Sequence, residues 1–415
     1  MTPREQSAKE EADFKTLIPL TGFFADYMEY TNLQESPASF HFWVAATIIG
    51  ATLQRRAWVD KGAYLVYPNL FTVLVAPTGK CRKSTAINMG TQLLTGSNWV
   101  NIIADKTTPE GLVDALAYGT EFVGSGVAKP DISYRDSCGL IKASELAVFL
   151  NRASYNQDMI TLLTTLYDCL DAWDYRLKTQ KAVHLQNIAV SFLAASTADW
   201  FDILPKDAFG GGFWSRFILV VKEETDRRIT MIKYKREEKA AVLRQQLLQI
   251  YASAKGAVRL TQEAYDWYVN WYNTHDEIAS DEKMIGFLER KQDVILKLAI
   301  ILAASHFYNI VDLSTIKQAY NIVTWTQQRA FDAFRFVGVT ALGELKERIT
   351  SFIREKQHPT SRGDVVKKFY RVLRNGVADI DAIEKMWNDT QEVEIQISQT
   401  TGRPKKLYII NKEAK

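Results

Sequence analysis

The chain has 415 residues, which predicts about two to three domains and enough length to bury a sizeable core. Hydrophobic residues make up 47% and charged residues 24%, a composition that excludes a disordered or fibrous protein. The 51 Lys and Arg against 48 Asp and Glu leave a formal net charge of only +3. This balance excludes a strongly basic coat for nucleic acid, so any contact with nucleic acid must come from local patches.

The three cysteines, Cys81, Cys138 and Cys169, show no C-x-x-C spacing, which argues against a disulfide framework or a zinc site. The longest apolar runs, 42–51 and 295–305, are too short and too interrupted to cross a bilayer. The charged start of the chain also lacks the apolar region of a signal sequence. We therefore expect an intracellular, reduced protein with no membrane partner.

The first part of the chain alternates between helix and strand patterns. A helical pattern runs from residue 14 to about residue 54, and strand-like alternation follows over 55–67. The apolar run 70–76 predicts a buried strand. Helices are predicted over 84–94 and 108–118.

Three further strands are predicted over 139–143, 188–195 and 217–221. A long helix is expected from 146 to about 171. The sequence DYRLKTQKAVHLQ, residues 174–186, alternates and turns as a hairpin does. Strands separated by helices favour an α/β fold.

After about residue 223 the pattern changes to long amphipathic helices, over 235–336, with no strong strand signal. The last segment, 342–415, differs again, because three helical stretches precede two alternating stretches at 392–398 and 405–410. Three helices and a two-stranded hairpin in roughly seventy residues are typical of the winged-helix arrangement.

The most informative stretch is Val73–Thr85, VLVAPTGKCRKST, in which an apolar strand, a turn with glycine and a helix beginning at Lys-Ser follow one another. A P-loop phosphate site is built in this way, because backbone N–H groups and the helix dipole favour an anion. Lys83 would reach the β- and γ-phosphates of a nucleotide, and the Ser84 hydroxyl would bind Mg²⁺.

The loop departs from the usual G-x-x-x-x-G-K-[ST] pattern in two ways. Arg82 stands where the last glycine is usual, and the spacing from Ala76 to Lys83 is one residue longer. An ordinary strand–turn–helix junction with a surface lysine is the alternative. The expected nucleotide-binding residues are Thr78, Gly79, Lys80, Cys81, Arg82, Lys83, Ser84 and Thr85.

A P-loop ATPase needs a second strand that ends in acidic residues, which hold Mg²⁺ and activate water. The strand 139–143 is followed by Ser144 and Glu145. We interpret Glu145 as the catalytic base and Ser144, which stands where an aspartate is usual, as a weaker partner of the hydrated Mg²⁺ ion. The alternative is that Glu145 only starts the next helix, where the dipole favours it.

Two later positions complete the candidate catalytic set. In ring ATPases a polar residue at the tip of a third strand senses the γ-phosphate through the attacking water, and the strand 188–195 ends at Ser196 and Thr197. Arg216 follows the glycine run 210–212 and would present its guanidinium to a neighbouring subunit's nucleotide, unless it only forms a surface salt bridge. Further candidates for γ-phosphate contact on the later helices are Arg290 and Lys297.

These elements, in this order, resemble the AAA+ ATPases. GFWSRF, residues 212–217, is similar to the arginine-finger segment of the MCM helicases, a group that also tolerates a replaced P-loop glycine and carries a C-terminal winged helix. YPNLFTVLVAPTGKCRKS, residues 67–84, together with Glu145 and GGGFWSRF, looks like the primase/helicase-like replication proteins of phages, prophages and plasmids. The resemblance spans about residues 35–330.

The resemblance implies ATP and Mg²⁺ as cofactors and a homo-oligomeric ring, expected to be hexameric. It also implies an α/β fold with an AAA+ type P-loop ATPase core. The expected segments are an N-terminal helical region over 1–54, the P-loop ATPase core over 55–222, a helical lid over 223–341 and a winged helix over 342–415.

DNA contact is expected at two places. In the helicase group that includes MCM and superfamily 3, a β-hairpin before the third strand projects into the ring channel and carries a basic residue. The hairpin within 174–186 has this place, and Arg176, Lys178 and Lys181 fit contact with phosphates without reading of sequence, although a solvated surface hairpin is the alternative. On the wing of the C-terminal segment, where protein contact is equally open, the candidates are Arg403, Lys405 and Lys406.

We therefore expect an ATP hydrolase that acts as a DNA helicase or translocase in the replication of a phage, prophage or plasmid. It would act on single-stranded or forked DNA in the cytoplasm of a bacterial host. No primase domain is visible, so priming would need a separate primase. One alternative is a nucleotide-dependent DNA-binding or helicase-loader module without unwinding activity, which the Ser144 and Arg82 departures favour. Another is an ATPase of an anti-phage system, which would share every motif.

Overall fold

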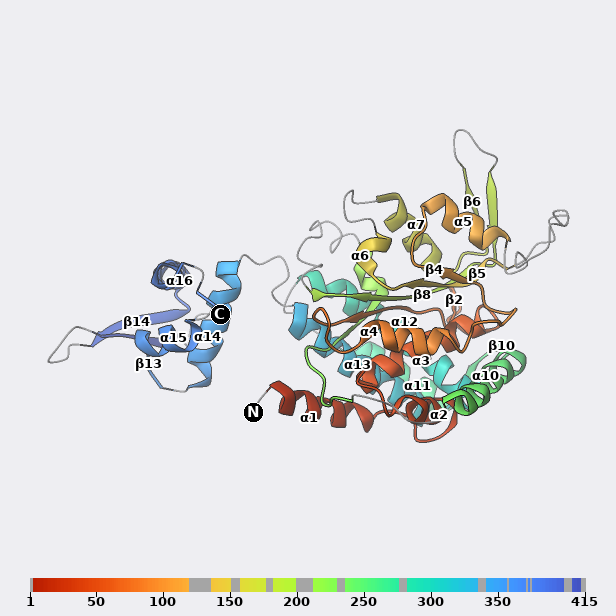
Figure 1. Cartoon of the computed structure of the whole chain (residues 1–415), viewed down its shortest axis with the longest axis horizontal. Coiled ribbons are helices and arrows are strands. Elements are labelled where there is room, and N and C mark those ends of the chain that lie inside the picture. The colour runs from red at the N-terminus through yellow and green to blue at the C-terminus, as the bar shows by residue number, and fades with distance from the viewer. Residues whose placement is uncertain are drawn as a thin grey trace. The chain divides into compact units, whose positions relative to one another are not determined.

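The computed structural model divides the chain into two compact units, Met1–Arg335 and Phe336–Lys415 (Figure 1). Within the part of the chain that the structure describes, no helix is long and apolar enough to cross a membrane. The described residues are 3–118, 136–150, 157–176, 182–198, 212–229, 236–275, 282–334, 341–356, 358–370, 372–373, 375–398 and 405–411.

A five-stranded parallel sheet forms the centre of the first unit. Strands β3 and β8 are buried at every position, as their apolar sequences predict, because helices cover both faces of the sheet. The expected α/β class is confirmed, and four of the strands lie within one residue of their predicted bounds; the pattern does not predict the short edge strand β4. In spatial order the strands are β4 (Ile102–Ala104), β5 (Cys138–Ala143), β8 (Ala189–Ser196), β3 (Phe71–Val75) and β9 (Phe217–Val221).

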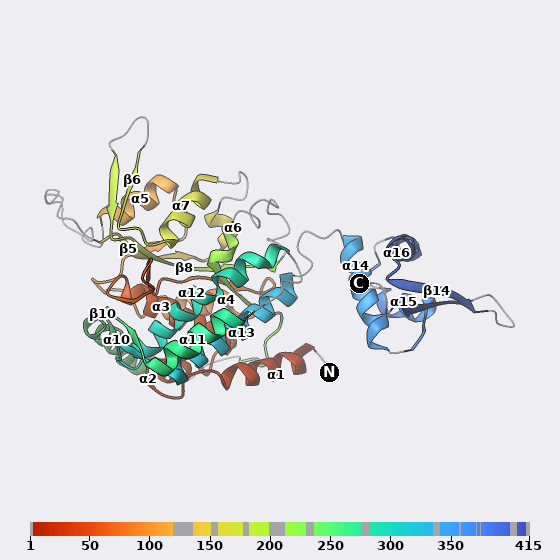
Figure 2. The same cartoon turned by 180° about the vertical axis from the view of Figure 1, so that it is seen from behind.

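Helices cover the two faces of this sheet (Figures 1 and 2). Every residue of α3 is buried, as expected for an apolar sequence without a polar face. Helix α4 approaches α3 closely at Gly90, where an added Cβ would lie 2.2 Å from Val44 Cγ1. One face carries α3 (Ala38–Leu53), α4 (Lys83–Thr91), α12 (Glu282–Ala304) and α13 (Leu313–Phe334), and the other carries α5 (Pro109–Tyr118), α6 (Leu146–Phe149) and α7 (Gln157–Tyr167).

One continuous hydrophobic core joins the N-terminal helices, the sheet and the later helices of the first unit, from Phe14 to Val323. The three segments expected over 1–54, 55–222 and 223–341 therefore share a single core within the described residues up to 334. Further α-helices among the described residues of this unit are α1 (Pro3–Lys15), α2 (Gly22–Thr31), α10 (Arg236–Ser253) and α11 (Gln262–Thr274).

Between β5 and β8 the structure differs from the predicted long helix and agrees with the predicted hairpin. The single helix expected over 146–171 is wrong, because α6 ends at Phe149, Leu150 leaves helical geometry and α7 begins at Gln157. The expected hairpin is present: β6 (Ala172–Tyr175) pairs with β7 (Val183–Gln186) and stands out from the unit (Figures 1 and 2).

Short strands connect the region before the sheet with the later helices. The alternation over 55–67 corresponds to β1 (Ala57–Asp60) and β2 (Leu65–Val66), and β1 also pairs in parallel with β10 (Gly256–Ala257). A second two-stranded sheet joins β11 (Arg259–Leu260) to β12 (Ile310–Val311). These two-residue strands interrupt the purely helical pattern expected over 235–336.

The described residues of the second unit form the three helices and two strands expected there, and one further short strand. Its sheet has the order β13-β15-β14, and Trp387 and Tyr408 lie fully buried in its core. The indole Nε1 of Trp387 donates to Thr350 Oγ1 at 2.9 Å, which satisfies its buried N–H group. The elements are α14 (Ala341–Glu355), β13 (Thr360–Ser361), α15 (Arg362–Phe369), α16 (Val377–Thr390), β14 (Val393–Ser398) and β15 (Lys405–Ile410).

Candidate functional site

The carboxyl ends of β3, β8 and β5 border a cleft of about 250 Å³ in the first unit. Because β8 lies between β3 and β5 and the three strands run parallel, the segments that follow them meet at one edge of the sheet, where ligands of open α/β sheets bind. Apart from Ala147 and Ala195, the lining residues are all ones that the sequence singles out: Thr78, Gly79, Lys83, Ser84, Ser144, Glu145, Ser196 and Thr197.

The loop between β3 and α4 turns sharply through left-handed backbone. The φ angles are 76° at Gly79, 57° at Cys81 and 45° at Arg82. No atom lies within 4 Å of a Cβ placed on Gly79, so the loop is open at this point. Left-handed backbone costs roughly 1–2 kcal/mol at a residue with a side chain, so Cys81 and Arg82 are strained. Arg82 thus adopts the conformation that the usual glycine would adopt without cost.

Residues between α2 and α3 hold this strained loop. Arg82 Nε donates to Glu35 Oε2 at 2.7 Å, and Ser36 Oγ donates to the Arg82 carbonyl oxygen at 3.1 Å. Glu35 Oε1 also accepts from the Ile229 N–H group at 2.9 Å. The hydrogen bonds from Ile229 and Arg82 lower the pKa of Glu35, so its carboxylate is charged at neutral pH. We call Glu35, Ser36 and their contacts with Arg82 the Glu35 clamp.

The side chains of Lys80, Cys81 and Arg82 do not line the cleft. Cys81 is buried and its Sγ lies 3.7 Å from the Lys222 carbonyl oxygen; burial raises the pKa of the thiol to about 12. Lys80 Nζ pairs with Glu224 at 2.6 Å. These residues would therefore meet a ligand through their backbone N–H groups, and Thr85 follows them as an exposed residue in the first turn of α4.

Lys83 is folded back over its own loop. Its Nζ donates to the Ala76 carbonyl oxygen at 2.5 Å and to the Pro77 carbonyl oxygen at 3.1 Å. Burial lowers the pKa of Lys83, while Cys81 and Glu145 act in the opposite direction. An anion in the cleft would stabilise the charged ammonium group, because an opposite charge offsets the loss of hydration.

The end of β5 presents Ser144 and Glu145 to the cleft. Glu145 has extended backbone, with φ of −142°, and precedes α6 without a capping hydrogen bond from its side chain. The Ser144 N–H group donates to Asp105 Oδ1 at 2.6 Å, so a carboxylate from the end of β4 lies beside the cleft. The sequence analysis missed Asp105; the available signal was the run Ile102–Ala104 before an acidic residue, which is too short to read as a strand.

Arg216 lies at the amino ends of the parallel strands, opposite the ends that border the cleft. It directly precedes Phe217, which pairs with Phe71 at the amino end of β3. Its Nη1 donates to the Gly212 carbonyl oxygen at 2.8 Å and its Nη2 pairs with Asp168 at 3.2 Å, which leaves its side chain only 11% exposed. The structure does not bring Arg216 to the cleft of its own chain.

The two later candidates also lie away from the cleft. Arg290 Nε donates to Ser215 Oγ at 2.8 Å, beside Arg216. Lys297 is buried at the amino end of β3, where its Nζ donates to the side-chain and backbone oxygens of Asn69. Both therefore lie near the amino ends of the strands.

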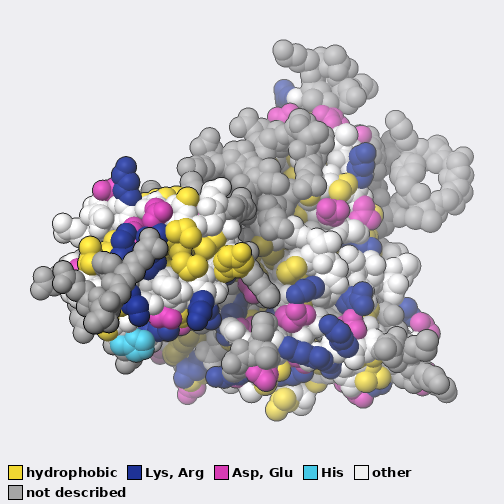
Figure 3. All heavy atoms as spheres, turned by 60° about the vertical axis from the view of Figure 1, so that its left-hand side comes forward, with side chains coloured by type: hydrophobic (Ala, Val, Ile, Leu, Met, Phe, Trp, Pro, Cys, Tyr) yellow, Lys and Arg dark blue, Asp and Glu magenta, His cyan; other side chains and the backbone are white. Residues whose placement is uncertain are grey.

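The residues expected to contact DNA are only partly described. Arg176 extends from the hairpin with 75% of its side chain exposed and pairs with Asp174 at 3.3 Å. On the wing, Lys405 is exposed, whereas Lys406 pairs with the buried carboxylate of Glu384. Lys178, Lys181 and Arg403 lie outside the described residues. Where Figure 3 shows described residues, Lys and Arg side chains are intermixed with Asp and Glu side chains.

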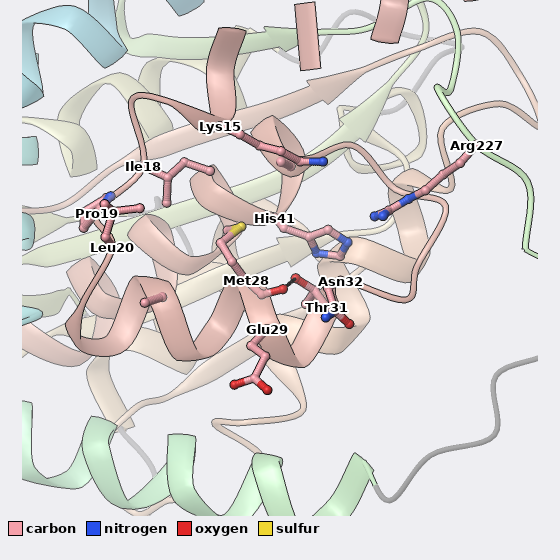
Figure 4. Close-up of a pocket in the computed structure, with 12 residues that line it drawn as sticks. Lys15, Ile18, Pro19, Leu20, Met28, Glu29, Thr31, Asn32, His41 and Arg227 are labelled. Atoms are coloured by element: carbon pink, nitrogen blue, oxygen red, sulfur yellow. Dashed lines mark hydrogen bonds between the residues drawn. The ribbon is translucent and has the colours of Figure 1, made fainter. Parts of the chain in front are cut away.

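A second cavity, of about 350 Å³, lies among α1, α2 and α3 (Figure 4). Ile18 and Met28 contribute apolar surface, and the Lys15 and Arg227 side chains extend toward the side where His41 lies. The cavity adjoins the segment that contains the Glu35 clamp, because Asn32 and Ala38, which flank this segment, line its wall. This cavity and the cleft at the strand ends have no lining residue in common.

Comparison with known proteins finds no protein-family model that matches the chain and no curated protein with significant similarity to it. The functional argument therefore depends on the residues and their geometry.

Glu35→Ala should loosen the loop between β3 and α4. Of the two hydrogen bonds that the variant loses, only the one from Arg82 holds this loop; it contributes about 0.5–1 kcal/mol, so the amides of residues 79–84 should exchange hydrogen about two- to fivefold faster. Hydrogen exchange followed by mass spectrometry measures this rate. Glu224→Ala is the matched control, because it frees Lys80 of the same loop from an exposed pair and should change exchange little. Equal effects of the two substitutions would contradict a specific role for the Glu35 clamp.

Proposed function

We propose that the first unit binds and hydrolyses ATP as a P-loop ATPase of the AAA+ type. The observation that carries the proposal is the meeting of Lys83, Ser84, Glu145 and Ser196 in one cleft, although they belong to three different strands or to the segments after them. Chance would not be expected to gather a lysine at a helix N-terminus, a hydroxyl beside it and a carboxylate opposite. The N-terminus of the nine-residue helix α4 adds backbone N–H groups and a dipole that favour phosphate.

In this proposal Lys83 exchanges two carbonyl oxygens for phosphate oxygens when a nucleotide binds. Glu145 accepts a proton from the water that attacks the γ-phosphorus, the bond to the bridging oxygen breaks, and ADP and phosphate leave. Ser196 and Thr197 lie between these two residues in the order of the strands and would orient the attacking water.

The oxygen-rich lining of the cleft suits Mg²⁺, which prefers hard oxygen ligands. Ser84 would bind the ion directly and Ser144 would contact its water shell. Mg²⁺ would neutralise charge on the β- and γ-phosphates.

The proposal extends to a homo-oligomeric ring, expected to be hexameric. Arg216 lies at the edge of the sheet opposite the cleft, so it would have to serve a neighbouring subunit's nucleotide. In the single chain it is paired with Asp168, and it would have to leave this pair when subunits assemble.

We further propose that ATP hydrolysis drives movement along single-stranded or forked DNA. Support comes from the hairpin β6–β7, which stands out from the unit with Arg176 exposed on it, and from the second unit, whose elements fit a winged helix. The setting would be the replication of a phage, prophage or plasmid in the bacterial cytoplasm, with a separate primase.

The second candidate function is a nucleotide-dependent DNA-binding or helicase-loader module that does not unwind. The pairing of Arg216 with Asp168 favours it, because a finger held within its own chain would not stimulate a neighbour's hydrolysis. An ATPase of an anti-phage system would share the same site and differ in setting.

Lys83→Ala and Glu145→Gln should separate binding from turnover. Lys83→Ala removes the positive charge that faces the phosphates and should abolish nucleotide binding. Glu145→Gln should keep binding but lower the rate of ATP hydrolysis on the order of 100-fold or more, because the catalytic base is lost. Titration with a fluorescent nucleotide and a phosphate-release assay measure the two quantities. Hydrolysis by Glu145→Gln at the parental rate would show that the base lies elsewhere.

Lys178→Ala combined with Lys181→Ala should uncouple ATP use from DNA. The DNA-stimulated part of the ATPase rate and the unwinding of a forked duplex should be lost, while basal hydrolysis persists. Each lost phosphate contact should also reduce the slope of DNA affinity against salt by about one.

The control for this test is Arg244→Ala on α10, which removes an exposed arginine paired with Glu237 and should leave DNA stimulation intact. If the double variant unwinds a fork as well as the parent, the hairpin does not drive translocation, and the loader or binding module becomes the better proposal.

A further inference from the structure

A carboxylate that the motif does not contain lies beside Ser144. Asp105 directly follows β4, the edge strand that pairs in parallel with β5. The Asp105 N–H group donates to the Lys142 carbonyl oxygen at 2.7 Å, and Asp105 Oδ1 accepts from the Ser144 N–H group at 2.6 Å. Asp105 thus reaches from the neighbouring strand to a residue that lines the cleft.

The backbone at Asp105 is held in a costly conformation. Its φ is 37°, in the left-handed region that residues with side chains rarely adopt, although Asp and Asn tolerate it better than most. Burial raises the pKa of Asp105, but hydrogen bonds from the side chain and backbone of Ser144 outweigh burial and lower it. The hydrogen bond from the Ser144 N–H group directs the Asp105 carboxylate at Ser144.

A hydrated Mg²⁺ ion in a P-loop site is normally held by a carboxylate at the end of the second strand, where this chain has Ser144. A serine hydroxyl carries no charge and attracts the waters of a metal ion only weakly. A carboxylate held beside that serine by the Ser144 N–H group would accept the hydroxyl proton in a hydrogen bond, which increases the negative charge on the hydroxyl oxygen and fixes its direction. The pair Asp105–Ser144 then offers what a single aspartate would offer.

We propose that Asp105 is a positioning residue for Mg²⁺: it replaces the carboxylate missing at position 144 by orienting and polarising the Ser144 hydroxyl toward the water shell of the ion bound at Ser84. The inference rests on the proposed nucleotide site. It also gives a reason for the strained backbone, which accompanies the contact of the Asp105 carboxylate with Ser144.

The test uses Asp105→Asn in the full chain. Asn has the same shape, tolerates left-handed backbone and can still accept from the Ser144 N–H group, so the variant removes the charge with little change of geometry. Mg²⁺ is titrated while the binding of fluorescent ADP is followed. The Mg²⁺ concentration that gives half of the full increase in ADP binding should rise about tenfold or more in the variant. Affinity for ADP in excess EDTA should not change. Ser144→Ala, which keeps the N–H bond to Asp105 but loses the hydroxyl, should show the same shift.

Rescue separates this role from a structural one. Ser144→Asp in the Asp105→Asn background restores a carboxylate at the usual place and should return the Mg²⁺ requirement toward the parental value. If Asp105 only supports the end of β5 through the Ser144 N–H group, neither single variant should shift the Mg²⁺ requirement, and Ser144→Asp should not lower it. That result would overturn the inference.

The failure of the inference can be told from failure of the proposed function. Where the parent binds Mg²⁺ and ADP in a Lys83-dependent way and Asp105→Asn behaves like the parent, the inference alone falls. Where the parent does not bind ADP at all, the proposed nucleotide site falls and the inference falls with it.

Discussion

Between β3 and α4 the chain passes through left-handed backbone at Cys81 and Arg82, and each of these side chains makes the turn costly by roughly 1–2 kcal/mol. The cleft depends on this turn, because it directs the start of α4 and Lys83 toward the ends of β5 and β8. The ion pair of Arg82 with Glu35 is partly exposed and offsets only part of the cost. The hydrogen bond from Ser36 and the burial of Cys81 stabilise the turn further. The conformation of the loop therefore depends on the segment between α2 and α3.

The residues proposed to act on the nucleotide of their own chain lie at one end of the parallel strands, and Arg216 lies at the other end. The carboxyl edge of the sheet gathers Lys83, Ser144 and Glu145, whereas Arg216 and the buried Lys297 lie at its amino edge. A continuous core from Phe14 to Val323 fixes this separation, because neither edge can move independently of the helices packed between them. In the proposed ring, the amino edge of one subunit would meet the carboxyl edge of the next.

Much of the fold and of the cleft could be predicted because the signals were local. Long apolar runs marked four of the five central strands, and a strand–turn–Lys-Ser sequence marked the loop at Lys83. The structure adds what distance in sequence hides: Glu35 beside Arg82, and Asp105 beside Ser144, are contacts across 47 and 39 positions. The break of the helix after Phe149 was missed because the apolar period resumes after it. The departures at Arg82 and Ser144 weaken the motif in the sequence, yet each has a carboxylate partner in the structure.

The most direct test of the central claim is a structure of the full chain with Mg²⁺ and a non-hydrolysable ATP analogue. The account predicts that the triphosphate lies over the N-terminus of α4 and that Lys83 Nζ leaves the Ala76 and Pro77 carbonyl oxygens for phosphate oxygens. Cys81 and Arg82 should keep their left-handed backbone on the Glu35 clamp. An analogue bound elsewhere, for instance in the cavity of Figure 4, with Lys83 still bonded to Ala76, would contradict the account.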